Sequence, residues 1–225
     1  MIIFLLTIPL LCQAQKKIYT RSYRIQDFKS RTTKVVLGAA GLEWSADFDA
    51  ALREDVTSLW DVSPYEFISA GEFEARKAES DSYFLFPVIE KGIVYLTLLK
   101  GGPDKDPDAL RTSMKLVSVP VAGEQDSSTL VYMPAFVSMV QDYMDAAISS
   151  ERVAYSGIKA IKRCKPSRIR VYRDPAEAAK VFHSGDDGAA VRITITPDGS
   201  PKSRPRYKMC FGAASYELYS FSRAL

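Results

Sequence analysis

The side chains best suited to act as nucleophile or base are a single histidine, His183, and the thiols of Cys164 and Cys210. A histidine that hydrogen-bonds a thiol can activate it as a nucleophile. Nothing in the spacing joins the three, and no Gly-x-Ser-x-Gly elbow is present. His183 is expected at the end of a helix, where an imidazole interacts favourably with the helix dipole. The sequence therefore assigns no catalytic residue.

Three alternating aspartates, Asp104, Asp106 and Asp108, resemble the start of a calcium loop. The sixth position of that loop, however, is Ala109 instead of glycine, and the twelfth is Lys115 instead of glutamate. A solvated loop explains the pattern better than a calcium site does.

A second acidic group, Glu43, Asp47 and Asp49, surrounds Trp44. Carboxylates paired beside an aromatic ring suit glycoside hydrolysis, but Asp47 and Asp49 are better explained as charges in the first turn of a helix. One histidine and two scattered thiols do not make a zinc site. We predict no metal and no cofactor.

Basic residues are concentrated in the last third of the chain. Residues 151–225 have a net charge of +8, against −5 for residues 1–150. Charge runs usually form solvated surfaces, but in an exported protein this one also suits an anionic envelope component or an acidic protein partner. Without interleaved aromatic residues, no nucleic acid is expected. The predicted partner surface comprises Arg163, Lys165, Arg168, Arg170, Lys202, Arg204 and Arg206.

The first half of the chain must supply strands and helices that position these groups. Residues 33–37 have the composition of a buried strand, and residues 45–60 repeat apolar side chains at helical spacing after Ser45 as N-cap. Residues 65–68 alternate as a strand does. Ser69 and Glu72 then form a capping box that begins the next helix.

Two strands, 83–89 and 93–100, are separated by Glu90, Lys91 and Gly92, which suits a hairpin with glycine at a positive φ. Pro87 cannot donate to a ladder, so its strand should lie at an edge or carry a bulge. A strand over 114–121 and a helix over 134–149 follow. The helix has a continuous apolar stripe, which is typical of a core helix.

The last third is expected to contain a strand at 168–172, a helix begun by Asp174 and Pro175, a strand at 189–195 and a closing hairpin at 207–222. Alternation in the first of these strands should place Arg168, Arg170 and Tyr172 on one face, with Ile169 and Val171 in the core. The order strand, short helix, strand, strand occurs twice, at 65–100 and 168–222. We predict an α+β fold with a mixed sheet and helices packed on it.

The 225-residue chain begins with an apolar run, 1–11, that is too short to span a bilayer. With Cys-Gln-Ala behind it, the run predicts a secretory signal at residues 1–14, and lipidation at Cys12 is the alternative. The mature protein is then extracytoplasmic, periplasmic or secreted, without a membrane span. Its two remaining thiols, Cys164 and Cys210, permit a disulfide or stay separate. We expect an α/β lobe at 15–150 and a smaller basic α+β lobe at 151–225. The smaller lobe is either a separate domain or part of the same domain as the first.

The segment Leu-Trp-Asp-Val-Ser-Pro-Tyr-Glu-Phe-Ile-Ser at 59–69, a capped helix, and Ser-Tyr-Phe-Leu-Phe at 82–86 resemble a group of exported proteins of Bacteroides-like Gram-negative bacteria. The first half also looks like the small α/β domain at the N-terminus of the periplasmic protein TolB. These motifs are structural, so the resemblance implies a fold and carries over no functional residue.

Two functions are consistent with these features. The first is a non-enzymatic binding module of the envelope, and the second is a small periplasmic hydrolase. A pocket with converging carboxylates, or with His183 beside a cysteine, would favour the hydrolase. A flat, charged surface would favour the binding module.

Overall fold

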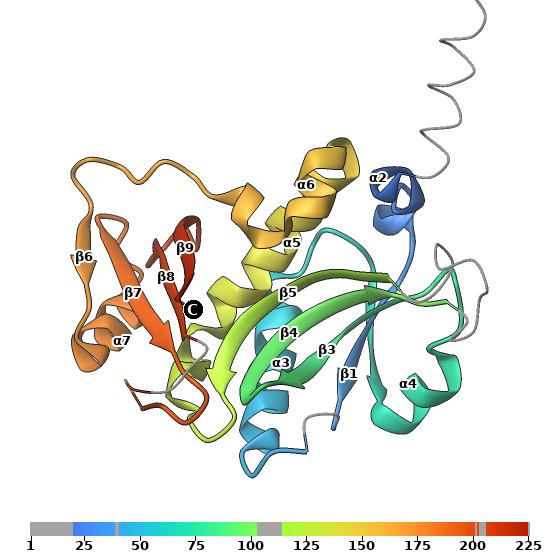
Figure 1. Cartoon of the computed structure of the whole chain (residues 1–225), viewed down its shortest axis with the longest axis horizontal. Coiled ribbons are helices and arrows are strands. Elements are labelled where there is room, and N and C mark those ends of the chain that lie inside the picture. Colours follow the sequence, from blue (N-terminus) through green and yellow to red (C-terminus); the bar gives the residue numbers. More distant parts are fainter. Residues whose placement is uncertain (1–19, 39–40, 103–113, 201, 203–205, 225) are drawn as a thin grey trace, which may run out of the picture.

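The computed structural model describes residues 20–38, 41–102, 114–200, 202 and 206–224, in which nine strands form two mixed sheets (Figure 1). The α+β fold is thus as predicted, although the strands divide between two sheets instead of one. The first sheet has the order β2-β1-β3-β4-β5. Its strands are β1 (Thr33–Leu37), β2 (Tyr65–Ser69), β3 (Tyr83–Glu90), β4 (Ile93–Lys100) and β5 (Met114–Gly123).

β1 lies between two parallel neighbours, β2 and β3, because helical crossovers carry the chain back before each new strand. These crossovers are α3 (Ser45–Leu59) and α4 (Ala70–Arg76). α3 begins at Ser45, but no side chain caps it, so the predicted N-cap role of Ser45 is wrong. The capping box of α4 is confirmed: the Glu72 N–H donates to Ser69 Oγ at 3.2 Å, and the Ser69 N–H donates to Glu72 Oε2 at 2.7 Å.

The β3–β4 hairpin turns at Lys91 and Gly92, with φ of 54° and 75°. Positive φ at both central positions is typical of a type I′ turn. The predicted positive φ of Gly92 is confirmed, and Lys91 has a positive φ as well. β3 is an inner strand, yet its pairing with β1 ends at Leu85. At Pro87, β3 pairs only with β4. The other side of β3 has no neighbouring strand at this position, so the missing N–H of proline costs no ladder hydrogen bond there.

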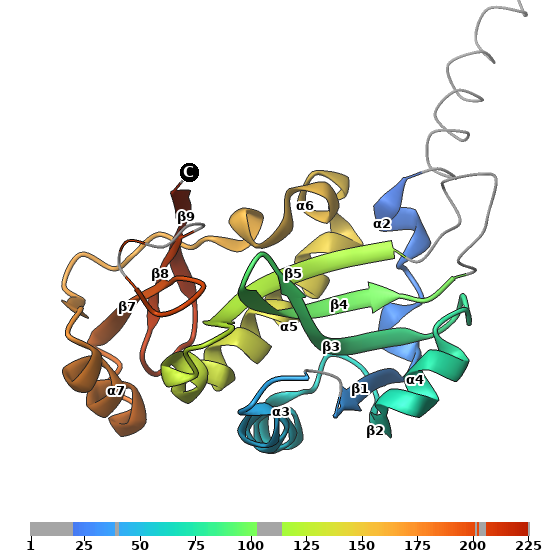
Figure 2. The ribbon, with the colours of Figure 1, turned by 60° about the horizontal axis from the view of Figure 1, so that its bottom comes forward.

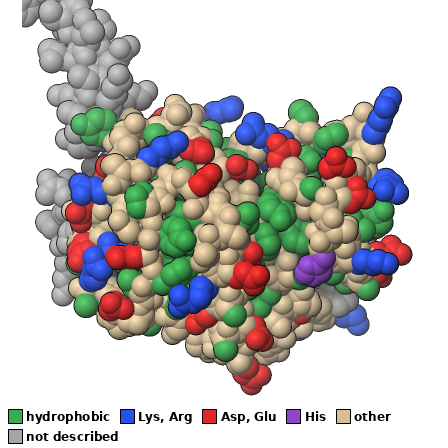
Figure 3. Space-filling model, turned by 180° about the vertical axis from the view of Figure 1, so that it is seen from behind, with side chains coloured by type: hydrophobic (Ala, Val, Ile, Leu, Met, Phe, Trp, Pro, Cys, Tyr) green, Lys and Arg blue, Asp and Glu red, His purple; other side chains and the backbone are tan. Residues whose placement is uncertain are grey.

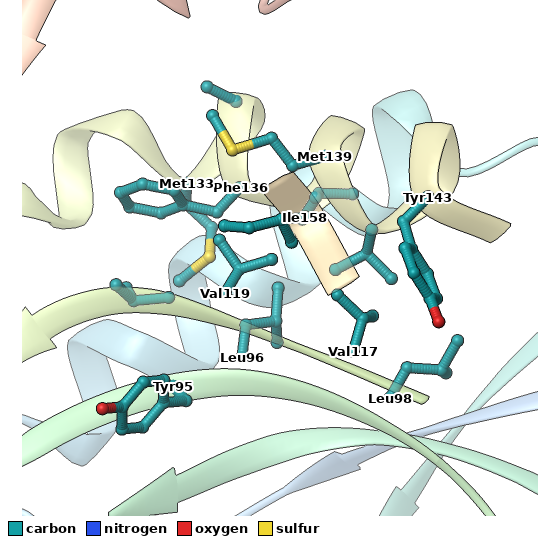
Figure 4. Packing of buried hydrophobic residues seen from close by; sticks show 14 of the residues in the cluster. Tyr95, Leu96, Leu98, Val117, Val119, Met133, Phe136, Met139, Tyr143 and Ile158 are labelled. Carbon is teal, nitrogen blue, oxygen red and sulfur yellow. The ribbon is translucent and has the colours of Figure 1, made fainter. Parts of the chain in front are cut away.

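The core lies between the first sheet and α5 (Met133–Ser149). Phe136, Met139 and Tyr143 of α5 lie over Leu96, Leu98, Val117 and Val119 (Figure 4). Tyr95 points to the other side of β4, as strand alternation requires. On that outer face α4 packs separately, with the Phe73 ring edge-to-face on Phe84 at 5.1 Å.

The second sheet has the order β6-β7-β8-β9, with β6 parallel to β7 and the rest antiparallel. Its strands are β6 (Arg170–Tyr172), β7 (Ala189–Ile195), β8 (Arg206–Gly212) and β9 (Leu218–Ala224). α7 (Pro175–Ser184) packs on it, begun by Pro175 and by an Asp174 carboxylate that accepts from two backbone N–H groups. The predicted helix start is confirmed.

Shorter helices connect these units, and the strand-helix-strand-strand order does occur twice. The two occurrences pair differently, since β6 and β7 are neighbours whereas β1 separates β2 from β3. The connecting helices are α2 (Arg21–Arg24), η1 (Phe28–Ser30), η2 (Ser128–Tyr132), α6 (Glu151–Ser156) and η3 (Gly157–Ile161). No helix in the described ranges is long and apolar enough to cross a membrane.

The two sheets share one hydrophobic cluster, and the expected boundary near residue 150 falls between α5 and α6 (Figure 2). Phe136 of α5 contacts Phe211 of β8, with ring centroids 6.3 Å apart. Two glycines let the backbones of the halves approach. A Cβ on Gly123 would lie 2.1 Å from the Thr196 carbonyl oxygen, and one on Gly92 would lie 2.7 Å from Pro197 Cβ.

Candidate functional site

The first basic run lies mainly in the segment between η3 and β6, where Arg163, Lys165 and Arg168 are exposed. The Arg163 N–H donates to the Leu218 carbonyl oxygen at 2.8 Å, so the segment is fastened to the start of β9. This places the run along the second sheet, on the side of the molecule that Figure 1 shows above β6 and β7.

The predicted facing of β6 is wrong. Arg170 and Tyr172 do share a face, but Tyr172 packs against the core and pairs with core-facing Val191. The larger apolar surface of tyrosine explains why it, and not Val171, is turned inward. Arg170 is 70% exposed and forms an ion pair with Asp186 at 3.2 Å, so it is not a free cation for a partner.

One face of β7 and β8 packs against α7 and the hydrophobic core. The opposite face carries Arg192, Lys208 and Cys210. Arg192 pairs with Cys210 across the strands, and both Arg192 and Lys208 are exposed. Lys165 and Arg173, from either side of β6, also act on the Cys210 thiol electrostatically. We call these residues, Lys165, Arg173, Arg192, Lys208 and Cys210, the basic face.

Sequence reasoning found this face only in part. Lys165 is one of the predicted partner residues, and Arg173 and Lys208 lie close to other predicted residues in the sequence. Arg192 is not predicted, because it stands alone in an apolar strand. Among the predicted partner residues near the C-terminus, Lys202 is exposed, while Arg204 lies outside the described residues. Arg206 is half-buried at the start of β8 and has an interaction partner.

Cys164 and Cys210 are both free thiols. Of the two alternatives left open by the sequence, a disulfide or two separate thiols, the structure has the second. Cys164 is exposed in the basic segment and Cys210 is buried in β8. Burial raises the pKa of the Cys210 thiol, although the neighbouring Arg192, Lys165 and Arg173 oppose that shift. Cys210 is therefore protonated at neutral pH and is not an activated nucleophile.

His183 lies in the last turn of α7, as predicted, and it lines a hollow of about 320 Å³ between α7 and α3. Glu54 and Asp55 of α3 line the same hollow, with Phe182 and Tyr216 among its apolar walls. Figure 3 shows the histidine in purple, across apolar side chains from acidic ones. Burial, and next the charge of Glu54, raise the pKa of Asp55 to about 6.

The acidic residues around Trp44 have separate positions and roles in the structure. Asp47 is in the first turn of α3 as expected, and the Asp49 carboxylate accepts from the Gly38 N–H at 2.8 Å. Trp44 donates its indole N–H to the Glu124 carbonyl oxygen, and Glu43 is exposed. Asp104, Asp106 and Asp108 lie outside the described residues. Within the described ranges no group of three histidine, cysteine or acidic side chains has the spacing to hold a metal ion.

Comparisons with protein-family models, with curated proteins and with solved structures find no match for the chain. The likeness to the N-terminal domain of TolB therefore stays a prediction from the sequence.

Proposed function

We propose that this chain is a non-enzymatic binding protein of the bacterial envelope, exported by a leader at residues 1–14, and that its basic face contacts an anionic partner. The observation that carries the proposal is a group of exposed cations around Cys210. Arg192 pairs with Cys210 in the register of β7 and β8 and shares this face with Lys208, and the exposed Lys165 and Arg173 lie before and after β6, close enough to interact with Cys210 electrostatically. Clustered cations attract anions over about 8 to 10 Å at physiological salt.

The availability of these cations supports the proposal. Within the described part of the chain, none of Lys165, Arg173, Arg192 and Lys208 forms an ion pair with a carboxylate, and all four are exposed. Alternation in β7 and β8 turns Arg192 and Lys208 away from α7 and the core. Exposed serines of β9, Ser220 and Ser222, pair with Cys210 and Lys208 and widen the polar surface.

The experiment is retention on immobilised heparin, used as a model polyanion, with elution in a salt gradient. Arg192→Glu combined with Lys208→Glu should elute at clearly lower salt than the parent. The control, Arg152→Glu combined with Lys180→Glu, makes the same change in net charge at exposed sites outside the basic face. Equal elution of the two double variants would show that net charge alone governs retention, and the proposal would be wrong.

A small hydrolase is the second candidate, favoured by one observation. Asp55, with a pKa of about 6, shares its hollow with Glu54 and His183. A carboxyl group that titrates near neutral pH can donate and accept protons in general acid–base catalysis. Activity of the purified protein on p-nitrophenyl esters, phosphates or glycosides, lost in Asp55→Asn, would establish this function in place of the first.

A further inference from the structure

A cleft between the two sheets has the chemistry of a binding site for a small anion, and it is separate from the basic face. Its volume is about 400 Å³, within the range of about 300 to 1,000 Å³ that small-molecule sites occupy. The walls come from the β3–β4 turn, β5, η3, β8 and β9. The residues of β8 and β9 that line it, Tyr207, Phe221 and Arg223, alternate with those of the basic face. The cleft and the basic face are therefore on opposite sides of the second sheet.

Three cationic side chains line the cleft: Lys91 in the type I′ turn, Lys159 in η3 and Arg223 in β9. Lys91 and Lys159 are exposed and, among the described residues, have no carboxylate partner. Arg223 has no ion pair there either, and its guanidinium lies 5.7 Å over the Tyr207 ring. The single carboxylate of the lining, Glu90, is already paired with Lys115. The cleft thus has an excess of positive charge without an internal counter-ion.

Two tyrosine hydroxyls add a neutral donor to these charges. Tyr95 and Tyr207 share one hydrogen bond of 2.9 Å, although each hydroxyl carries a hydrogen. One hydrogen of the pair is therefore left over, and the described residues offer it no other acceptor. Burial raises the pKa of Tyr95, so the hydroxyl remains a donor at any physiological pH. An oxyanion in the cleft would accept this hydrogen together with charge-assisted bonds from Arg223 and the lysines.

The rest of the lining is apolar or neutral. Ile158 and Pro120 are aliphatic, and the Phe221 ring lies beside Tyr207 with centroids 5.7 Å apart. An inorganic ion would leave this apolar surface exposed to water, whereas a ligand with a ring or an aliphatic group would bury it. We propose that the intersheet cleft binds a small organic oxyanion, a carboxylate or phosphate monoester with an apolar body.

Titration calorimetry at a constant ionic strength of 0.1 M tests the assignment with four probes. Phenyl phosphate and benzoate carry an oxyanion and a ring, inorganic phosphate carries only the oxyanion, and phenol carries only the ring. One of the first two should bind more tightly than inorganic phosphate and phenol, and which of them does so identifies the anionic group. Failure of both probes to bind up to 10 mM, tenfold above a dissociation constant of about 1 mM, would overturn the proposal.

Variants of the full chain complete the test. Lys159→Gln removes an exposed charge and should spare the fold, and Arg223→Gln removes the cation that lies over the Tyr207 ring; each should weaken binding about tenfold or more. Tyr95→Phe should weaken it less, by removing one hydroxyl of the pair. Lys180→Gln, on α7, is the matched control and should bind like the parent. Equal binding by Lys159→Gln, Arg223→Gln and the control would place any anion site elsewhere.

The result is independent of the basic face. Arg192→Glu combined with Lys208→Glu should bind the preferred probe as the parent does, while Arg223→Gln should keep most of its retention on heparin. Loss of probe binding in the basic-face variant would show that one surface serves both ligands, and the separate cleft site would be wrong.

Discussion

Replacing Asp55 by asparagine should stabilise the protein at pH 7.5 and change its stability much less at pH 4. The pKa of this carboxyl group rises from 3.8 to about 6 in the folded protein, first because the native state buries it and next because Glu54 is a neighbouring negative charge. A group with a raised folded pKa holds its proton more tightly in the native state. Its favourable contribution is therefore complete below pH 3.8 and is lost as the pH rises through about 6.

The magnitude follows from that difference in pKa. Without screening, the two values correspond to about 3 kcal/mol. Asp55 is only half-buried, and solvent screening reduces the contribution to about 1 kcal/mol. The neutral amide of Asp55→Asn is not subject to this penalty at high pH. The variant should gain about 1 kcal/mol over the parent at pH 7.5 and only a small part of that at pH 4.

Urea denaturation at both pH values, followed by circular dichroism, measures the effect. Asp61→Asn is the control, since Asp61 is exposed just beyond the end of α3. Asp61→Asn removes the same charge close to α3, but Asp61 does not line the hollow. A gain for Asp55→Asn that is equal at both pH values, or equal to that of Asp61→Asn at pH 7.5, would refute the reasoning.

Three further outcomes are expected. Ser69→Ala should lower the free energy of unfolding by about 1 kcal/mol, because it removes half of a capping box; an unchanged urea midpoint would contradict this. Gly123→Ala should destabilise by about 1 to 3 kcal/mol or more, since its Cβ would meet a backbone oxygen, and a melting temperature equal to that of the parent would show that the backbones separate easily. Intact-mass measurement of exported material should give a chain that begins near Gln15, and retained Met1 would disprove the leader.

Local elements could be predicted from the sequence because their signals are local. The Ser69–Glu72 capping box, the Lys91–Gly92 turn and the Asp174–Pro175 helix start each depend on residues within one turn of each other. The order of the strands could not be predicted in the same way. Insertion of β1 between β2 and β3, and the division into two sheets, depend on pairings between distant residues.

The same limit applies to the candidate sites. Lys165 was found through its charged neighbours, but Arg192 stands alone in an apolar strand and joins the basic face only through pairing with Cys210. The facing of β6 was misjudged because alternation says which residues share a face and not which face is buried. The intersheet cleft joins Lys91 to Arg223, which are more than a hundred positions apart, so no short motif could mark it.

The close contact of Gly92 and Gly123 with Thr196 and Pro197 bears on how the protein folds during synthesis. The β3–β4 hairpin is local and can form within about 10 microseconds. Gly92, at the tip of the hairpin, contacts Pro197 only after about a hundred more residues have been synthesised. Closing this long loop adds only a small entropic cost. Until then Phe136 also lacks Phe211. A nascent chain stopped at residue 150 would leave this side of α5 uncovered, and such exposed apolar surface makes intermediates prone to aggregate.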